Sequence, residues 1–323
     1  MKFKIITLLL LAVTAFNARS QAPQQPLFQM PVVPDSIVLL YDRTDYLLAH
    51  YWDFCDVKKA FSARDRFRGA VIDYFSLMPY GTVDGVKSSI SSFMKKVSTS
   101  KEPVQFVADI AEQTFYSDTA ALASDQLYLM FLDELLANKK VDKNMKLRYA
   151  HQKHVLEGSQ SGQPAPKLTY TDPIGTEYTF APDTTKAGAI IFFNDPDCSG
   201  CSMARLRIDA DILSRTVIEK GIIDFYSIYP GDADAEWLQS AVSYPETWKT
   251  GAAPDADQDW DIRQSPLFYI LNRDGSILVV TGDVNEVIDI LGRLAQVSGH
   301  APSAFNRNRT KSPAAEPQSE PQL

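Results

Sequence analysis

The chain has 323 residues, a formal net charge of −8 and three cysteines. The acidic charge argues against a nucleic-acid partner, because phosphate backbones repel it and no basic stripe offsets it. Three cysteines are also too few for the disulfide framework of a small secreted protein. The length exceeds what one hydrophobic core usually organises, so we expect two domains.

The first residues predict a leader for export. Two lysines precede an apolar run at residues 5–16, which is too short to span a bilayer, and an Ala-Arg-Ser triplet then ends at Ser20. We therefore expect a signal peptide at residues 1–20, cleaved after Ser20, and a periplasmic protein with no membrane span after cleavage. Cleavage removes three basic residues and takes the net charge from −8 to −11. An uncleaved anchor is the alternative.

A helical segment follows. Residues 21–34 hold four prolines and are expected to form an extended tether. From 35 to 158 the apolar residues recur at helical spacing, which predicts an antiparallel helical bundle. The expected helices lie near residues 37–51, from Ser62 to about 77, and at 82–98, 101–116, 124–138 and 142–157. Ser62 with Asp65 resembles a capping box, and Ser124 and Asp142 are candidate caps.

The pattern changes after a Gly-, Ser- and Pro-rich segment, and an α/β domain is expected at 159–298. Two short alternating segments flank a turn at 172–175, and the apolar run 189–193 is typical of a strand buried on both faces. The further expected elements are a helix at 199–220, a strand at 222–228, a helix at 233–242, strands at 267–271 and 277–281, and a helix at 284–297. Residues 299–323 lack an apolar period and are expected to be a disordered tail.

The motif Cys198-Ser199-Gly200-Cys201 follows the buried strand after a short loop and opens a helix. The N–H groups and partial positive charge at a helix N-terminus favour a thiolate on the first cysteine. The spacing lets the second sulfur reach the first and close a disulfide. In this hypothesis Cys198 attacks a disulfide of the partner, Cys201 resolves the mixed disulfide, and neither a tightly bound cofactor nor a metal is needed.

Further motifs accompany this pair. They are residues 162–166, Asp172 with Gly175, residues 260–266, and Asp274 with Gly275. With these motifs, residues 162–297 resemble the TlpA/ResA-like branch of thioredoxin-fold oxidoreductases. The resemblance implies a central mixed sheet flanked by helices. It also implies a cis Ser265-Pro266 peptide beside the disulfide, with Ser265 offering backbone hydrogen bonds to a substrate. The helical segment is similar to an uncharacterised domain that precedes such modules in exported bacterial proteins.

The sequence departs from that family near the motif. Asp197 stands where the family usually has an aromatic residue, and Asp195 lies two residues earlier. Both carboxylates should oppose the helix dipole and disfavour the Cys198 thiolate. Phe192 occupies the position of an acid in thioredoxin, so the sequence identifies no proton acceptor for resolution. A weakly stabilised thiolate favours a reductase over a strong oxidant.

The leading hypothesis is a thiol-disulfide oxidoreductase that acts on thiols and disulfides of other exported proteins. Its electrons would come from an unidentified membrane-linked donor. The alternative is a binding or scaffold protein in which the helical domain captures a partner and the thioredoxin-like module has little redox activity. A peroxidase is disfavoured, because peroxidatic cysteines normally follow a threonine by three residues and position 195 is Asp.

Other readings of these residues remain open. The cysteine pair has two alternatives, a structural disulfide or half of a zinc site with His151 and His154; the small ring and the tight histidine spacing disfavour both. Cys55 is expected to be a small buried residue, with a regulatory thiol as the alternative. The acidic stretch 229–261 is expected to form solvated loops. Its alternative is a docking lip beside Pro266 that uses the tryptophans of this stretch.

Overall fold

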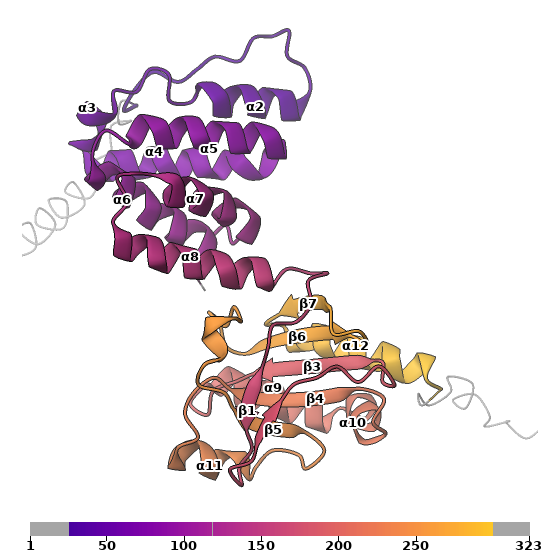
Figure 1. Cartoon of the computed structure of the whole chain (residues 1–323). Helices are drawn as coiled ribbons and strands as arrows, with labels where there is room; N and C mark the ends of the chain where they lie inside the picture. Colours follow the sequence, from indigo (N-terminus) through magenta and orange to yellow (C-terminus); the bar gives the residue numbers. More distant parts are fainter. Residues whose placement is uncertain (1–25, 118, 300–323) are drawn as a thin grey trace, which may run out of the picture. The chain divides into compact units, whose positions relative to one another are not determined.

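The computed structural model describes residues 26–117 and 119–299. The chain forms two compact units that divide between Lys146 and Leu147, a helical unit and an α/β unit (Figure 1). The expected signal peptide, its cleavage site after Ser20 and all but the first residue of the expected tail lie outside the described residues. Among the helices described, none is both long and apolar enough to cross a membrane.

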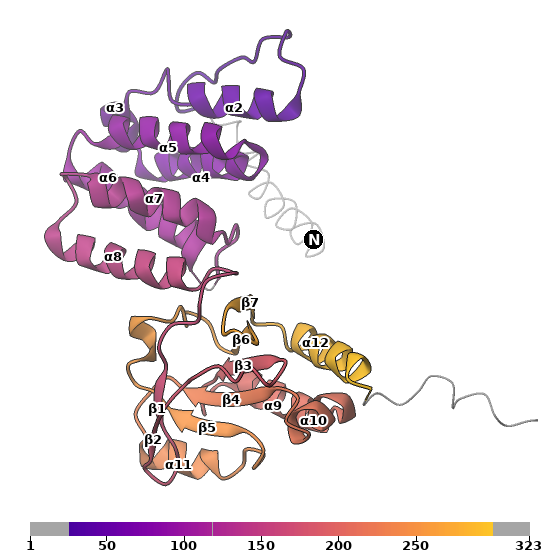
Figure 2. The same cartoon turned by 45° about the vertical axis from the view of Figure 1, so that its right-hand side comes forward.

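The helical unit follows the predicted periodicity closely. Its helices are α2 (Leu40–His50), α3 (Val57–Phe61), α4 (Arg64–Leu77), α5 (Val83–Val97), α6 (Lys101–Ala111), α7 (Asp125–Ala137) and the start of α8 (Lys143–Gly158). The 3-10 turn η1 (Met78–Tyr80) follows α4, and the π-helical turn η2 (Glu112–Tyr116) extends α6. Both views show α4, α5, α6 and α7 side by side, which forms a helical bundle (Figures 1 and 2).

Aromatic rings fill the centre of this bundle. Trp52 stacks on Phe93 with ring centroids 4.4 Å apart, and Tyr74 meets both rings edge-on. The Tyr74 hydroxyl is satisfied by the Ser89 hydroxyl, which donates in turn to the Leu48 carbonyl. Burial of these large rings stabilises the unit, and the Tyr74 hydroxyl is paired, whereas the buried indole nitrogen of Trp52 has no hydrogen-bond partner among the described residues.

The helix boundaries include one wrong prediction and one confirmed prediction. Ser62 does not cap α4, because that helix begins at Arg64 after Ala63, which offers no side-chain cap. The Ser62 hydroxyl instead donates to the Lys59 carbonyl at the end of α3. Ser124 caps α7 as expected, since its hydroxyl accepts from the Leu127 N–H at 3.3 Å. Within the expected tether, residues 26–34 carry no helix or strand, and Phe28 packs 5.3 Å from Trp52.

The α/β unit is built on a mixed sheet. Within the described residues this sheet has seven strands in the order β2-β1-β5-β4-β3-β6-β7. They are β1 (Thr169–Thr171), β2 (Glu177–Thr179), β3 (Gly188–Phe193), β4 (Asp224–Tyr229), β5 (Lys249–Ala252), β6 (Leu267–Asn272) and β7 (Ile277–Thr281). The central strand β3 pairs parallel with β4 and antiparallel with β6.

Side chains of β3 enter two cores, one on each face of the sheet. Ile190 and Phe192 pack in the core that includes residues of α9, α10 and α12. Ile191 and Phe193 enter the opposite core with Trp260. The helices of this unit are α9 (Ser199–Ala210), α10 (Ile212–Glu219), α11 (Ala235–Ala241) and α12 (Val284–Val297). Burial on both faces explains why this strand has no polar alternation.

Two elements differ from the prediction. The expected helix at 199–220 is two helices, because Asp211 adopts an extended backbone and caps α10 by accepting from the Ser214 N–H at 2.8 Å. Strand β5 was not predicted and pairs parallel with β4. Its Gly251 is required by close approach, since a Cβ there would lie 2.2 Å from Cδ2 of Tyr170.

Candidate active site

Cys198 and Cys201 form a disulfide at the N-terminus of α9, with Cα atoms 5.2 Å apart. Cys198 is the N-cap residue, and its sulfur accepts from the Cys201 N–H at 3.0 Å. Cys198 is half-buried, whereas Cys201 is only 3% exposed. The first cysteine is therefore the more accessible one. The N–H at the helix end can stabilise its thiolate after reduction.

The loop that leads into β6 lies against the buried sulfur of Cys201. The Ser265-Pro266 peptide is cis, as the resemblance implies, and Oγ of Ser265 lies 3.0 Å from Sγ of Cys201. A Cβ at Gly200 would lie 3.3 Å from Cδ of Pro266, so the glycine of the motif lets the proline pack close to it. The structure thus brings all four predicted site residues together, namely Cys198, Cys201, Ser265 and Pro266.

The hydroxyl of Ser265 is the polar group at the buried sulfur. Phe192, which stands at the position of the thioredoxin acid, stacks on Phe268 with centroids 4.4 Å apart. An aromatic pair therefore occupies the position from which a carboxylate could accept the proton of Cys201. Sequence reasoning assigned only backbone hydrogen bonds to Ser265 and missed this side-chain contact. A hydroxyl-bearing residue directly before the proline was the available signal.

A buried amide anchors the end of β3 just before the motif. Asn194 donates through Nδ2 to the Phe192 carbonyl and to Oγ of Ser227, both at 3.0 Å. Its Oδ1 accepts from the Tyr244 hydroxyl. The next residue, Asp195, accepts at its carbonyl from the Cys198 N–H at 3.1 Å. These hydrogen bonds hold the end of β3 and the loop that carries the cysteine motif. Asn194 and Tyr244 were not among the predicted site residues.

Carboxylates gather on one side of the motif. Partial burial, followed by the charges of Asp195, Asp234, Asp197 and Glu236, raises the pKa of Tyr229. The side chains of the motif loop and of the start of α11 therefore share one negative rim around this phenol. Oδ1 of Asp195 also accepts from the Asp197 N–H at 2.8 Å, which shapes the loop. Of these four acids, Asp195 and Asp197 stand within three positions of Cys198 in the chain, and their negative charge disfavours a thiolate there.

Other predicted candidates lie elsewhere. Nε2 of His151 lies 3.0 Å from the Asp257 carbonyl, and Nε2 of His154 lies 2.9 Å from Oδ1 of Asp259. Both histidines thus contact the acidic loop, whereas the two cysteines of the motif are bonded to each other. In the part of the chain that the structure describes, no three His, Cys, Asp or Glu side chains are grouped to hold a metal.

Cys55 is a buried free thiol of the helical unit. Burial raises its pKa to about 11, although the charge of Lys96 acts in the opposite direction. The prediction of a small buried residue is confirmed. The docking lip built on tryptophans is wrong, because Trp237, Trp248 and Trp260 are all buried in the α/β unit.

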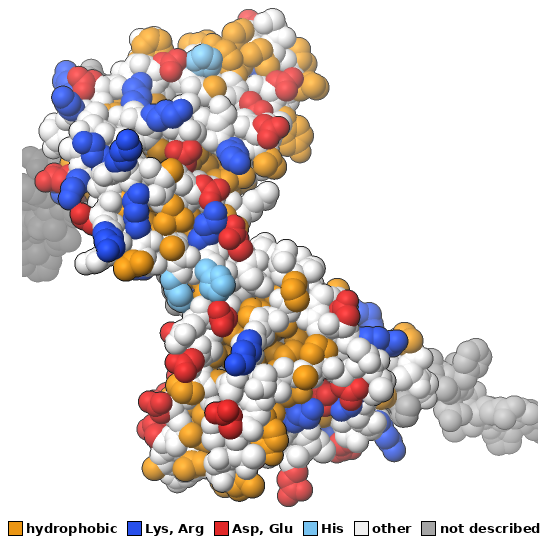
Figure 3. All heavy atoms as spheres, in the orientation of Figure 1, with side chains coloured by type: hydrophobic (Ala, Val, Ile, Leu, Met, Phe, Trp, Pro, Cys, Tyr) orange, Lys and Arg blue, Asp and Glu red, His pale blue; other side chains and the backbone are white. Residues whose placement is uncertain are grey.

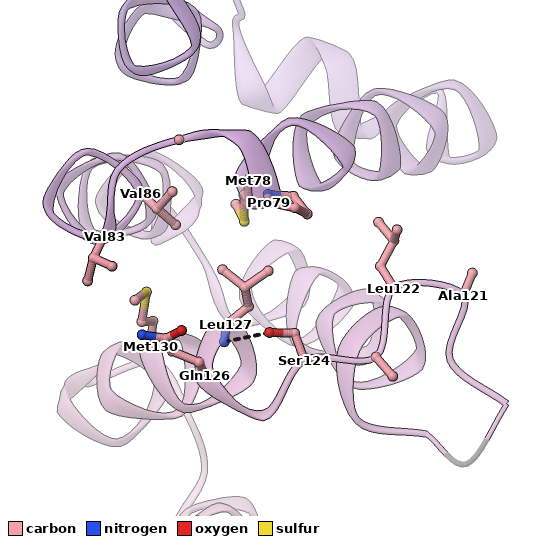
Figure 4. A pocket seen from close by; sticks show the side chains of 12 residues that line it. Met78, Pro79, Val83, Val86, Ala121, Leu122, Ser124, Gln126, Leu127 and Met130 are labelled. Carbon is pink, nitrogen blue, oxygen red and sulfur yellow. Dashed lines mark hydrogen bonds between the residues drawn. The ribbon is translucent and has the colours of Figure 1, made fainter. Parts of the chain in front are cut away.

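The helical unit carries a pocket of its own, with a volume of about 460 Å³. The side chains of Met78, Val83 and Val86 lie on one side of it, and those of Leu127 and Met130, both from α7, lie on the other (Figure 4). Ser124, on the same wall, uses its hydroxyl to accept from the N–H of Leu127. Most of the lining side chains are hydrophobic, but Ser124, Gln126 and backbone groups add polar surface, and methionines adapt easily to different shapes. The pocket can therefore hold an apolar group.

Comparisons with known proteins agree with this architecture. Residues 12–159 match the family model described as a domain of unknown function, DUF5106. A thioredoxin-like protein from Bacteroides caccae is 19% identical, with a TM-score of 0.65 over 82% of this chain and 97% of its own. This likeness shows that the chain has a thioredoxin-like fold. The predicted fold class and the predicted uncharacterised helical domain are thus confirmed.

Two further structures cover one part of the chain each. A conserved protein of unknown function from Bacteroides fragilis is 27% identical over 41% of this chain and 99% of its own, with a TM-score of 0.39. A thiol:disulfide interchange protein from Bacteroides sp. is 15% identical over 47% of this chain and 97% of its own, with a TM-score of 0.35. A search of curated proteins finds no match.

Proposed function

We propose that the chain is a thiol-disulfide oxidoreductase that reduces disulfides of other exported proteins. The observation that carries the proposal is the Cys198–Cys201 disulfide, held at the N-terminus of α9 beside Ser265-Pro266 with its first cysteine the more exposed. A thioredoxin-like fold supports a redox role for such a pair. The composition of residues 1–20 supports export to the periplasm.

The reaction begins with the reduced chain. The Cys198 thiolate attacks one sulfur of the substrate disulfide, that S–S bond breaks, and the released substrate thiolate takes a proton from water. Cys201 then loses its proton and attacks the Cys198 sulfur. The mixed disulfide breaks, the second substrate thiolate is protonated, and the Cys198–Cys201 bond forms again. Two electrons and two protons have passed to the substrate.

A dithiol donor must then reduce the chain, and we propose that it is linked to the membrane. Its thiolate attacks Cys198, and the electron pair of the breaking bond moves to the Cys201 sulfur. The Ser265 hydroxyl lies 3.0 Å from this sulfur and can donate a hydrogen bond to it as negative charge develops. Ser265 would thereby act as a positioned donor in a site that has no carboxylate in the thioredoxin place.

Insulin reduction with dithiothreitol tests the proposal. The full chain should accelerate turbidity above the dithiothreitol background, and Cys198→Ser should return the rate to that background. Cys55→Ala is the matched control, because this thiol is buried in the other unit, and it should keep the wild-type rate. Equal rates for the wild type and Cys198→Ser would contradict an enzymatic role.

The direction of exchange is tested by the reduction potential of the Cys198–Cys201 pair. A value near that of thioredoxin, about −270 mV, supports a reductase. A value near about −120 mV, which is typical of a strong oxidant, contradicts that direction.

The second candidate function is binding by the helical unit with a redox-silent disulfide. The pocket beside Met78 and Met130 favours it, because a cavity with hydrophobic side chains and a few polar groups can accept a side chain or small ligand of a partner. Equal insulin reduction by the wild type and Cys198→Ser would favour this candidate over the first.

A further inference from the structure

A second pocket, with a volume of about 730 Å³, lies in the α/β unit. One wall is the β1–β2 hairpin, and the other is the chain from the end of α11 to β5. Among the residues that line it are five aromatic side chains, namely Tyr170, Tyr178, Tyr226, Tyr244 and Trp248. Neither Cys198 nor Ser265 belongs to its lining, so this pocket is separate from the disulfide.

The aromatic walls are held in place by packing. The rings of Tyr170 and Tyr178 stack with centroids 5.6 Å apart, and Gly251 leaves the space that the Tyr170 ring needs. The indole of Trp248 packs 4.2 Å from the Phe225 ring. Because these rings are fixed by neighbours within the unit, the pocket is preformed, and a planar ring can stack in it at little ordering cost.

The pocket also holds an ammonium group, that of Lys249, which shares its buried ion-pair partner with a second lysine. Nζ of Lys249 lies 4.7 Å over the Tyr226 ring and 3.0 Å from Oδ1 of Asp224. Nζ of Lys186 lies 2.6 Å from the same buried oxygen. Two ammonium groups thus share one buried carboxylate. The exposed carboxylate of Asp183 also interacts with both, but its Oδ1 already accepts from the N–H and the hydroxyl of Thr185. The Lys249 side chain is 44% exposed and the Lys186 side chain 24%, so Lys249 is the ammonium that a ligand can reach.

The two acids of the lining oppose this charge only in part. Oδ1 of Asp172 is occupied by the N–H groups of Ile174 and Thr176 in its own turn. Glu246 is exposed to solvent, as Lys249 is, so screening weakens the charges of both. On the face shown in Figure 3, hydrophobic side chains gather on this unit, with both basic and acidic side chains among them.

We infer that this pocket binds a planar aromatic ligand that carries a carboxylate or another small anionic group. The exposed ring of Tyr178 and the half-buried ring of Tyr244 supply stacking surface, the buried rings of Tyr170, Tyr226 and Trp248 support the walls, and Lys249 supplies an ion pair with the anionic group. The volume lies within the range of about 300–1,000 Å³ that is usual for small-molecule sites. The proposal does not depend on the redox chemistry of the cysteine pair.

Calorimetric titration of the full chain with three naphthalene probes tests the inference. Naphthoate should bind about tenfold more tightly than the neutral naphthamide, because it alone can pair with Lys249, and naphthylmethylammonium should bind more weakly than either. Lys249→Gln should abolish the preference for naphthoate over naphthamide. Asp224 keeps Lys186 in this variant, so its buried carboxylate retains a partner.

Two further variants locate the site. Tyr178→Ala removes a stacking ring that is 46% exposed, and it should weaken all three probes. Lys220→Gln removes one exposed charge outside the pocket and should leave every affinity unchanged. The inference is overturned if naphthamide binds the wild type as tightly as naphthoate. It is also overturned if Tyr178→Ala binds the three probes as tightly as the wild type does. This second variant keeps the inference testable even if Lys249→Gln does not fold.

Discussion

Replacement of Ser265 by alanine isolates the contribution of one hydroxyl to the redox cycle. The change removes Oγ, which lies 3.0 Å from Sγ of Cys201, and leaves the backbone of the following proline in place. A hydrogen bond to a charged group is worth about 1.5–3 kcal/mol. Cys201 is only 3% exposed, so water replaces this donor poorly. We take the lower end of that range, because charge on the leaving sulfur is only partly developed in the transition state.

A loss of about 1.4 kcal/mol corresponds to a tenfold change in rate. We therefore expect Ser265→Ala to slow the opening of the disulfide by dithiothreitol about tenfold at a fixed pH. The time course is measured by acid quenching, thiol labelling under denaturing conditions and mass spectrometry, which counts labelled cysteines per chain. Cys55 is labelled in every sample and adds a constant background.

Ser265→Thr is the matched control, because it keeps the hydroxyl and should stay within about twofold of the wild-type rate. Reduction of Ser265→Ala at the wild-type rate would show that the hydroxyl does not assist the leaving sulfur. Equal slowing in both variants would assign the effect to altered packing of the loop instead.

Three predictions concern the ionisation of the thiols. In the reduced chain, Asp197→Ala should let iodoacetamide alkylate Cys198 at lower pH than in the wild type, because one nearby carboxylate is gone. Identical pH profiles for the two proteins would show that Asp197 does not disfavour the Cys198 thiolate. Cys55, with its pKa raised to about 11 by burial, should resist alkylation at pH 8 in the folded chain and react in urea. Because the pKa of Cys55 is higher in the folded chain, the unfolded chain loses the thiol proton at lower pH. The free energy of unfolding should therefore decline as the pH rises from about 9 towards 11. A melting temperature that stays constant across this pH range would contradict the prediction.

The sequence predicted those elements whose residues carry an unbroken local pattern. The strand β3 is apolar at nearly every position because both of its faces are buried, and the disulfide motif is recognised because it directly follows this strand. Strand β5 was missed because Lys-Thr-Gly-Ala has no apolar alternation and becomes a strand only through pairing with β4. The break at Asp211 was missed because a single capping residue interrupts an otherwise helical period.

The side-chain contacts that complete the site could not be predicted from local sequence patterns. Ser265 meets Cys201 across 64 positions of the chain, and Tyr244 reaches Asn194 across 50. Nothing in the neighbourhood of either residue specifies its distant partner. The cis Ser265-Pro266 peptide was expected only because the motifs resemble a family in which this proline lies beside the disulfide, which shows how family resemblance can supply long-range information that composition lacks.

The hydrogen bonds of the Asn194 amide bear on how the fold would respond to opening of the disulfide. Its bonds to Phe192, Ser227 and Tyr244 involve no sulfur, so opening and closing the disulfide breaks none of them. In the proposed exchange these hydrogen bonds can persist in both states of the disulfide, so β3 need not rearrange when the bond between the two cysteines opens.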